Sequence, residues 1–119
     1  MTSEPARDDA SLHHGDRPTA ERLDQAARVF QMLSDPTRLH LLWSLTHGPA
    51  DVGTLVEQTG AARTSVSQHL SKLRLAGLVR TRKDGRRVLY SLPGGHLERL
   101  VQEGLNHADH QVTGEPHHG

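Results

Sequence analysis

The spacing of the apolar residues changes at Gly77, and this change limits the folds open to the chain. Before Gly77, apolar residues recur at helical spacing, which is typical of helices that bury one face. After Gly77, the segments 78–83 and 86–92 have the composition of strands and flank Asp84-Gly85, a strong signal for a tight hairpin. The sequence therefore predicts several helices followed by one β-hairpin.

Capping residues and glycines divide the rest of the chain into helices. The first helix is expected from Pro18 to Leu33, and the second starts at the N-cap Asp35 and stops at Gly48. The third is expected from Val52 to Thr59, between the cap Asp51 and Gly60, the fourth from Arg63 to Ala76 and the last from about His96 to His110. The third and fourth are joined by a short turn that contains glycine, as in a helix-turn-helix. The order α-α-α-α-β-β-α predicts a mainly α fold with a β-hairpin wing, which is a winged helix-turn-helix.

The length of 119 residues suits one domain with two tails. Residues 1–17 are predicted to be a disordered tail, residues 18–110 the domain, and residues 111–119 a flexible tail that contains histidines. So small a chain buries a thin core, and a homodimer that shares apolar surface is expected. No signal peptide is recognisable, and no apolar segment approaches the roughly 20 residues that span a bilayer. We therefore expect a cytoplasmic protein without a membrane partner.

Positive charge is concentrated in one third of the chain, although the formal net charge is zero. Residues 60–92 contain eight Lys or Arg residues and Asp84 as their one acid, a net charge of +7. The segments on either side are acidic. Because the basic segment coincides with the predicted helix-turn-helix and hairpin, it favours double-stranded DNA as the partner.

The predicted fourth helix carries side chains of the types that read DNA. Hydroxyl, amide and cationic groups can bond to base edges or to phosphates. The tip of the hairpin adds cations that can reach flanking phosphates or the minor groove. The predicted DNA-contacting residues are Arg63, Thr64, Ser65, Ser67, Gln68, His69, Lys72, Arg82, Lys83, Arg86 and Arg87.

Four segments of the chain resemble the ArsR/SmtB family of metal-sensing repressors. They are Leu33-Ser-Asp-Pro-Thr-Arg-Leu39, Ser65-Val-Ser-Gln-His-Leu70, Leu73-Arg-Leu-Ala-Gly-Leu-Val79 and Asp84-Gly-Arg-Arg-Val-Leu-Tyr-Ser-Leu92. The resemblance extends over about residues 20–112. It implies a homodimeric winged helix that binds an operator palindrome through a recognition helix starting at Arg63. It also implies that the outer helices form the dimer interface and that an effector changes the operator affinity.

The family places its metal sites at different positions. A site built from cysteines is excluded, because the chain has none. Another type of family site lies in the last helix, where this chain has His96, His107 and His110. The three share one stripe, but the eleven residues from the first to the second rise about 16.5 Å along a helix. Ligands lie about 2 Å from their ion, so His96 is expected to join His107 and His110 of a second chain, giving two symmetric sites.

The donors of this site favour nickel or cobalt, with zinc as a third candidate. The site is similar to those of the family's nickel- and cobalt-responsive members. The family's usual zinc site has an aspartate two residues before the first histidine, where this chain has Gly94. Candidate additional ligands are Glu103, Asp109, His13, His14, His117 and His118. The apolar stripe expected at the dimer interface is Leu97, Leu100, Val101, Leu105 and Ala108.

Two other functions stay open from the residues alone. One is a regulator of the same fold whose histidines bind no metal, and the other is a histidine-rich metal carrier. An enzyme is disfavoured, because no His-Glu-x-x-His pattern and no Ser/His/Asp arrangement is present. The residues expected in the core include Phe30, Trp43 and Tyr90. The hairpin face expected to be apolar carries Val88, Tyr90 and Leu92, whereas His40 and His47 are expected to be structural or solvated.

Overall fold

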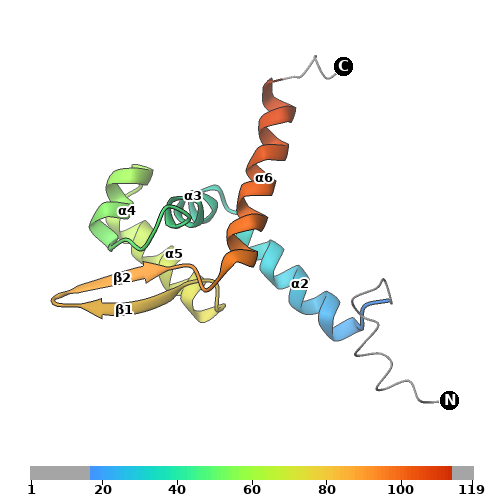
Figure 1. Cartoon of the computed structure of the whole chain (residues 1–119), viewed down its shortest axis with the longest axis horizontal. Helices are drawn as coiled ribbons and strands as arrows, with labels where there is room; N and C mark the ends of the chain where they lie inside the picture. Colours follow the sequence, from blue (N-terminus) through green and yellow to red (C-terminus); the bar gives the residue numbers. More distant parts are fainter. Residues whose placement is uncertain (1–16, 114–119) are drawn as a thin grey trace. The chain divides into compact units, whose positions relative to one another are not determined.

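The computed structural model describes residues 17–113 (Figure 1). The elements, in chain order, are α2 (Ala20–Leu33), α3 (Pro36–Leu45), α4 (Val52–Thr59), α5 (Arg63–Leu75), β1 (Arg80–Asp84), β2 (Arg87–Ser91) and α6 (Gly95–Thr113). This order confirms the predicted winged helix-turn-helix. The predicted tails lie largely outside the described residues, as do His13, His14, His117 and His118.

The chain divides into two units, residues 1–31 and 32–119. In the first unit, the described residues are 17–31, and most of them belong to α2. This helix has its apolar residues at helical spacing, yet none of its residues is buried within the single chain. Leu23 is 55% exposed and Phe30 is 58% exposed. The prediction that Phe30 lies in the core is therefore wrong for the single chain, because its helix face is left uncovered.

Two aspartates begin the first two helices of the second unit. The carboxylate of Asp35 accepts a hydrogen bond from the backbone amide of Arg38 at 3.0 Å, and Pro36 follows in the first turn of α3. Asp51 caps α4 in the same way, through the amide of Thr54 at 2.9 Å. Helix α4 ends at Gly60, whose φ of 74° is the left-handed conformation that favours glycine. Both capped helix starts lie where the sequence predicts them.

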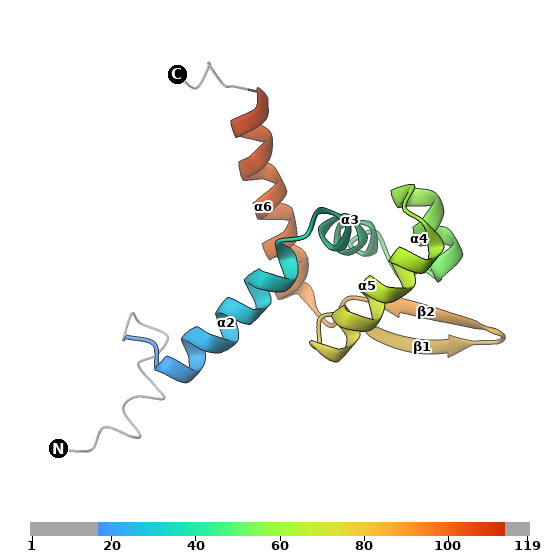
Figure 2. The same cartoon turned by 180° about the vertical axis from the view of Figure 1, so that it is seen from behind.

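Helix α3 is the centre of the second unit. It packs against α4, α5 and α6, while α4 also packs against α5 and β2. Figures 1 and 2 show α3 between α6 and the pair α4 and α5. The buried apolar residues are Leu41, Leu42, Leu45, Ala50, Leu55, Val66, Leu70, Leu73, Leu78, Val79, Leu89, Leu97 and Val101. The hydroxyl of Ser44 is buried among the described residues without a hydrogen-bond partner.

The wing is an antiparallel hairpin of β1 and β2. Asp84 pairs with Arg87, so the two turn residues are Gly85 and Arg86 rather than the expected Asp84 and Gly85. Gly85 has a φ of 68°, and glycine at the first central position is what a type II′ turn requires. Residues Ala50 and Tyr90 exchange backbone hydrogen bonds of 3.0 and 2.8 Å, which join the wing to the segment before α4.

Two further expectations about the core are corrected. The buried residue of β2 is Leu89, whereas Val88 is 38% exposed and Tyr90 is only half-buried. Both faces of this strand carry bulky apolar residues, so alternation alone did not identify the inner face. Trp43 is 39% exposed and is not among the buried residues of α3, which are Leu41, Leu42, Ser44 and Leu45.

Helix α6 begins at Gly95 and extends three residues past the expected end at His110. Its first half belongs to the core, since Leu97 is 8% and Val101 is 1% exposed. Leu97 and Val101 are thus covered within one chain and do not belong to the predicted interface stripe. The second half extends beyond the packed helices, with Val112 83% exposed. Within residues 17–113, no helix combines the length and the apolar character needed to cross a membrane.

Candidate nucleic-acid interface and metal ligands

Helix α5 exposes a polar face and buries an apolar one. Val66, Leu70 and Leu73 are buried against the core. On the other side, the predicted contact residues Arg63, Thr64, Ser67, Gln68 and Lys72 are exposed. Ser65 and His69 are half-buried. The helix starts after Ala62, which gives no side-chain cap, unlike the aspartates before α3 and α4. Its first amides can therefore donate to an anion.

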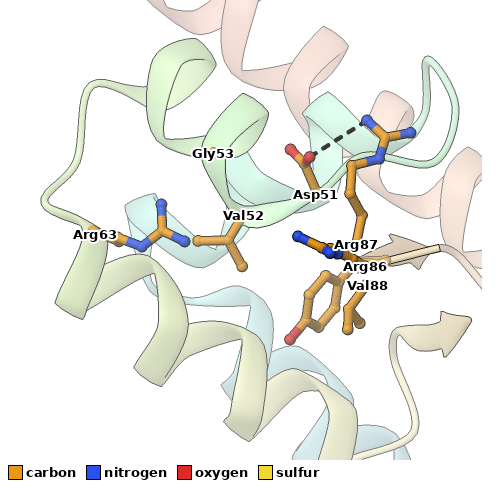
Figure 3. A pocket seen from close by; sticks show the side chains of 8 residues that line it. Asp51, Val52, Gly53, Arg63, Arg86, Arg87 and Val88 are labelled. Carbon is orange, nitrogen blue, oxygen red and sulfur yellow. Dashed lines mark hydrogen bonds and ion pairs between the residues drawn. The ribbon is translucent and has the colours of Figure 1, made fainter. Parts of the chain in front are cut away.

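A cleft of about 450 Å³ lies between the start of α4, the start of α5 and the wing (Figure 3). It brings together three of the predicted contact residues, Arg63, Arg86 and Arg87, from segments that are distant in sequence. The remaining lining residues are Asp51, Val52, Gly53, Val88 and Tyr90. Three guanidinium groups around one open cleft favour the binding of a phosphate group.

The guanidinium of Arg87 is already engaged within the chain. It lies 3.5 Å from Oδ2 of Asp51 and 3.3 Å from Oδ2 of Asp84, the first contact being drawn in Figure 3. Arg87 therefore ties the wing to the start of α4. The pKa of Asp51 lies below its ordinary value, first because its carboxylate accepts the Thr54 amide, with Arg87 as a smaller cause. No local sequence pattern indicates this pairing, since the two residues lie 36 positions apart.

His69 lies in α5 but its ring faces the start of α3. Its Nδ1 lies 3.4 Å from Nη1 of Arg38, and its Nε2 lies 3.6 Å from Oδ2 of Asp35. The pKa of Asp35 is lowered, chiefly by the hydrogen bond from the Arg38 amide and further by the charges of His69 and Arg38. His69 is predicted to contact DNA, but its ring contacts Arg38 and Asp35 of the same chain.

The three predicted metal ligands, His96, His107 and His110, are exposed on the single helix α6. Within residues 17–113 of one chain, no group of three or more metal-binding side chains is close enough to hold an ion. This agrees with the helical rise, which keeps His96 apart from the other two. The donors are imidazoles, which suit nickel, cobalt and zinc. Nδ1 of His96 accepts a hydrogen bond from Nη2 of Arg99 at 3.1 Å.

A second, apolar hollow of about 340 Å³ lies between α3 and α6. It is lined by Pro36, Leu39, His40, Trp43 and Leu105. The indole of Trp43 lies between two imidazoles, with ring centroids 6.1 Å from His40 and 4.6 Å from His47. His40 and His47 are therefore exposed residues that flank Trp43, in line with the structural or solvated role expected for them.

Comparison with known proteins gives consistent matches. Residues 35–81 match the family described as "Bacterial regulatory protein, arsR family". The chain is 48% identical to the HTH-type transcriptional regulator KmtR of Mycobacterium tuberculosis, over 76% of this chain and 69% of that protein. It is 38% identical to the regulator NmtR of the same organism, over 76% and 75%.

A solved structure also resembles the fold. It is the solution structure of a homodimeric winged helix-turn-helix DNA-binding domain from Mycobacterium bovis, described as a possible ArsR-family transcriptional regulator. The TM-score is 0.71 at 32% identity, and the match covers 83% of this chain and 92% of that one. These matches are to transcriptional regulators and not to enzymes.

Proposed function

This chain belongs to the arsR family of bacterial transcriptional regulators, and we propose that a divalent metal controls its affinity for operator DNA. In this proposal the active form is a homodimer, and the metal binds between the α6 helices of the two chains. The observation that carries it is the separation of two exposed surfaces. One is the basic face of α5 and the wing, and the other is the imidazole stripe of α6.

The DNA surface consists of the exposed face of α5 and the tip of the wing. Gln68 and Ser67 are exposed on α5 and can bond to base edges in the major groove. Arg63 and Arg86 line the cleft and can hold a backbone phosphate near the uncapped start of α5. Arg82, Lys83 and Lys72 are exposed and supply further positive charge. Contacts of Thr64, Ser65 and Arg87 to DNA are part of the same proposal.

The dimer interface is proposed to form from α2 and the second half of α6. Support comes from their uncovered apolar side chains, Leu23, Phe30 and Val112, which are 55%, 58% and 83% exposed in one chain. Leu105 is half-buried at the rim of the hollow beside Trp43. Burying such side chains against a second copy is favourable by about 1.5–3 kcal/mol each. The similar domain from Mycobacterium bovis is homodimeric, which supports a dimer of this chain as well.

The metal site is proposed to join His96 of one chain to His107 and His110 of the other. Antiparallel α6 helices bring these positions together at both ends of the pair, which gives two equivalent sites. We favour nickel or cobalt, with zinc as the third candidate, because the donors are imidazoles without thiolates. Glu103 is exposed on the same helix and is a candidate oxygen ligand. Bound metal would act by favouring one relative orientation of the two recognition helices.

The test is operator binding with and without each metal. An operator would be selected from random-sequence DNA by the purified protein, and its affinity measured with chelator, nickel, cobalt or zinc. We expect at least one metal to change the affinity, and His96→Ala to remove this change while leaving metal-free binding intact. His47→Ala is the matched control, since His47 is an exposed histidine outside α6. Unchanged affinity with all three metals would contradict the metal response but not DNA binding.

A further inference from the structure

The polar cluster of Asp35, Arg38 and His69 connects the recognition helix α5 to the start of α3. The guanidinium of Arg38 can only donate, so Nδ1 of His69, 3.4 Å away, is the acceptor. A neutral imidazole with an acceptor at Nδ1 carries its proton on Nε2. That nitrogen faces the Asp35 carboxylate at 3.6 Å. The ring therefore lies between a donor and an acceptor that both belong to α3 or its cap.

The same cluster holds the start of α3 to the chain that enters it. Asp35 accepts the Arg38 amide at 3.0 Å, and Nε of Arg38 donates to the backbone carbonyl of Met32 at 2.7 Å. The two side chains that contact His69 are thus themselves fixed by backbone groups. A ring that accepts from one fixed side chain and faces a second one has little freedom to shift along α3.

Burial separates His69 from its neighbours on α5. Its side chain is 19% exposed, whereas Gln68 and Lys72 belong to the exposed face. Polar contacts in such a partly buried place are less weakened by water and salt than surface contacts. The contact is therefore suited to fix the angle of α5, and the imidazole faces the start of α3 rather than the solvent.

We propose that His69 is a positioning residue that sets the orientation of the recognition helix and does not contact DNA. Base readout needs this orientation, because hydrogen bonds to base edges tolerate little displacement. Phosphate contacts from long arginine side chains tolerate more. Loss of the His69 contacts should therefore reduce discrimination between sequences while general attraction to DNA is kept.

The test compares His69→Ala and His69→Gln on a selected operator and on a random duplex, without metal. The Ala variant is expected to bind the operator about tenfold more weakly, with unchanged affinity for the random duplex and an unchanged salt slope. The Gln variant should recover most of the loss, because its amide oxygen can accept from Arg38 and its NH₂ group can donate to Asp35. A reduced salt slope, or no recovery with Gln, would overturn the proposal.

A panel of operators with single base-pair changes distinguishes positioning from contact. If His69 positions the helix, the Ala variant loses discrimination across the whole half-site. If it reads a base directly, discrimination is lost at one base pair only, and the proposal is wrong.

Asp35→Asn provides a second variant in case His69→Ala does not fold. Asparagine caps helices about as well as aspartate, so α3 keeps its start while the charge facing His69 is removed. We expect the same loss of discrimination, in a smaller amount. In the double variant with His69→Ala and Asp35→Asn, the two losses should be less than additive, since both affect one contact. Additive losses would contradict the proposed role of His69. The assay contains no metal, so failure of the metal response leaves these outcomes unchanged.

Discussion

The guanidinium of Arg99 donates a hydrogen bond to Nδ1 of His96, across 3.1 Å on the first turn of α6. This leaves the proton of a neutral imidazole on Nε2, so neither nitrogen is ready to bind a metal in this arrangement. The positive charge of Arg99 also lies beside the proposed site. Metal binding therefore has to displace Arg99 from His96, either to free Nδ1 or to let the proton move there from Nε2.

Replacing Arg99 should strengthen metal binding. We expect Arg99→Met to raise the affinity for nickel by up to about tenfold, the equivalent of one net hydrogen bond. Isothermal titration with nickel, cobalt and zinc measures the change. Arg80→Met is the matched control, because Arg80 is an exposed arginine at the start of the wing, outside α6. Weaker binding by the Arg99 variant would mean that the guanidinium supports the site.

The two arginines of the wing should behave differently on DNA. Arg86→Gln is expected to weaken binding to all sequences and to lower the salt slope by about 1 per chain, as for one lost phosphate contact. Arg87→Gln should lower the slope by less, because its guanidinium is paired with Asp51 and Asp84. Fluorescence anisotropy at several salt concentrations gives both slopes. Equal decreases would show that Arg87 leaves its partners to bind phosphate.

The capping aspartates should make the stability depend on pH in acid. Both Asp35 and Asp51 have a pKa below the ordinary 3.8, because each accepts a backbone amide of its helix. A lowered folded-state pKa means that the folded state binds fewer protons than the unfolded one. The stabilisation is complete above the ordinary value and is lost as pH falls from there through the folded-state pKa.

Urea unfolding measured from about pH 5 downwards should therefore show a falling free energy of unfolding. The double variant with Asp35→Asn and Asp51→Asn should flatten this fall. Asp24→Asn serves as the control, since Asp24 is an exposed residue of α2. An equal pH dependence in all three proteins would contradict the role given to the two caps.

The buried hydroxyl of Ser44 should be dispensable. It has no hydrogen-bond partner among the described residues and is 3% exposed. Ser44→Ala removes an unsatisfied polar group and introduces a better helix former, so the free energy of unfolding should rise by about 0.5–1 kcal/mol. Ser67→Ala, on the exposed face of α5, controls for helix propensity alone. A loss of stability at position 44 would reveal a partner for this hydroxyl in solution.

The two halves of α6 should respond differently to a buried charge. Leu97→Asp places the charge in the core of one chain and should unfold the protein. Leu105 lies at the rim of the apolar hollow. The substitution Leu105→Asp should therefore dissociate the proposed dimer while the helices persist. Analytical ultracentrifugation with circular dichroism separates the two outcomes. A dimer unaffected by Leu105→Asp would exclude the second half of α6 from the interface.

Local signals in the sequence predicted the elements well. The limits of α4 follow from Asp51 and Gly60, because a side-chain cap and a left-handed glycine act on neighbouring residues. The turn lies one residue later than expected, because in Asp84-Gly85-Arg86 the glycine can occupy either central position. The observed pairing of Asp84 with Arg87 places Gly85 at the first central position.

Contacts between residues that are distant in the sequence could not be predicted from local patterns. The pairing of Arg87 with Asp51, and that of His69 with Asp35 and Arg38, depend on how α3, α4, α5 and the wing pack. Amphipathic spacing also placed Leu97 and Leu105 on one stripe, although the core of the chain covers only the first. A period identifies the apolar face of a helix but not the surface that covers it.

Trp43 is the single tryptophan of the chain, and it borders the same hollow as Leu105 of α6. Its indole is 39% exposed and stands between the rings of His40 and His47. Indole emission depends on contact with water and with neighbouring rings, so any sliding of α6 over α3 should alter the colour or intensity of the fluorescence. Trp43 is thus an intrinsic fluorescence probe of the packing between α3 and α6. Movement of α6 against α3 can be followed in real time without an attached dye.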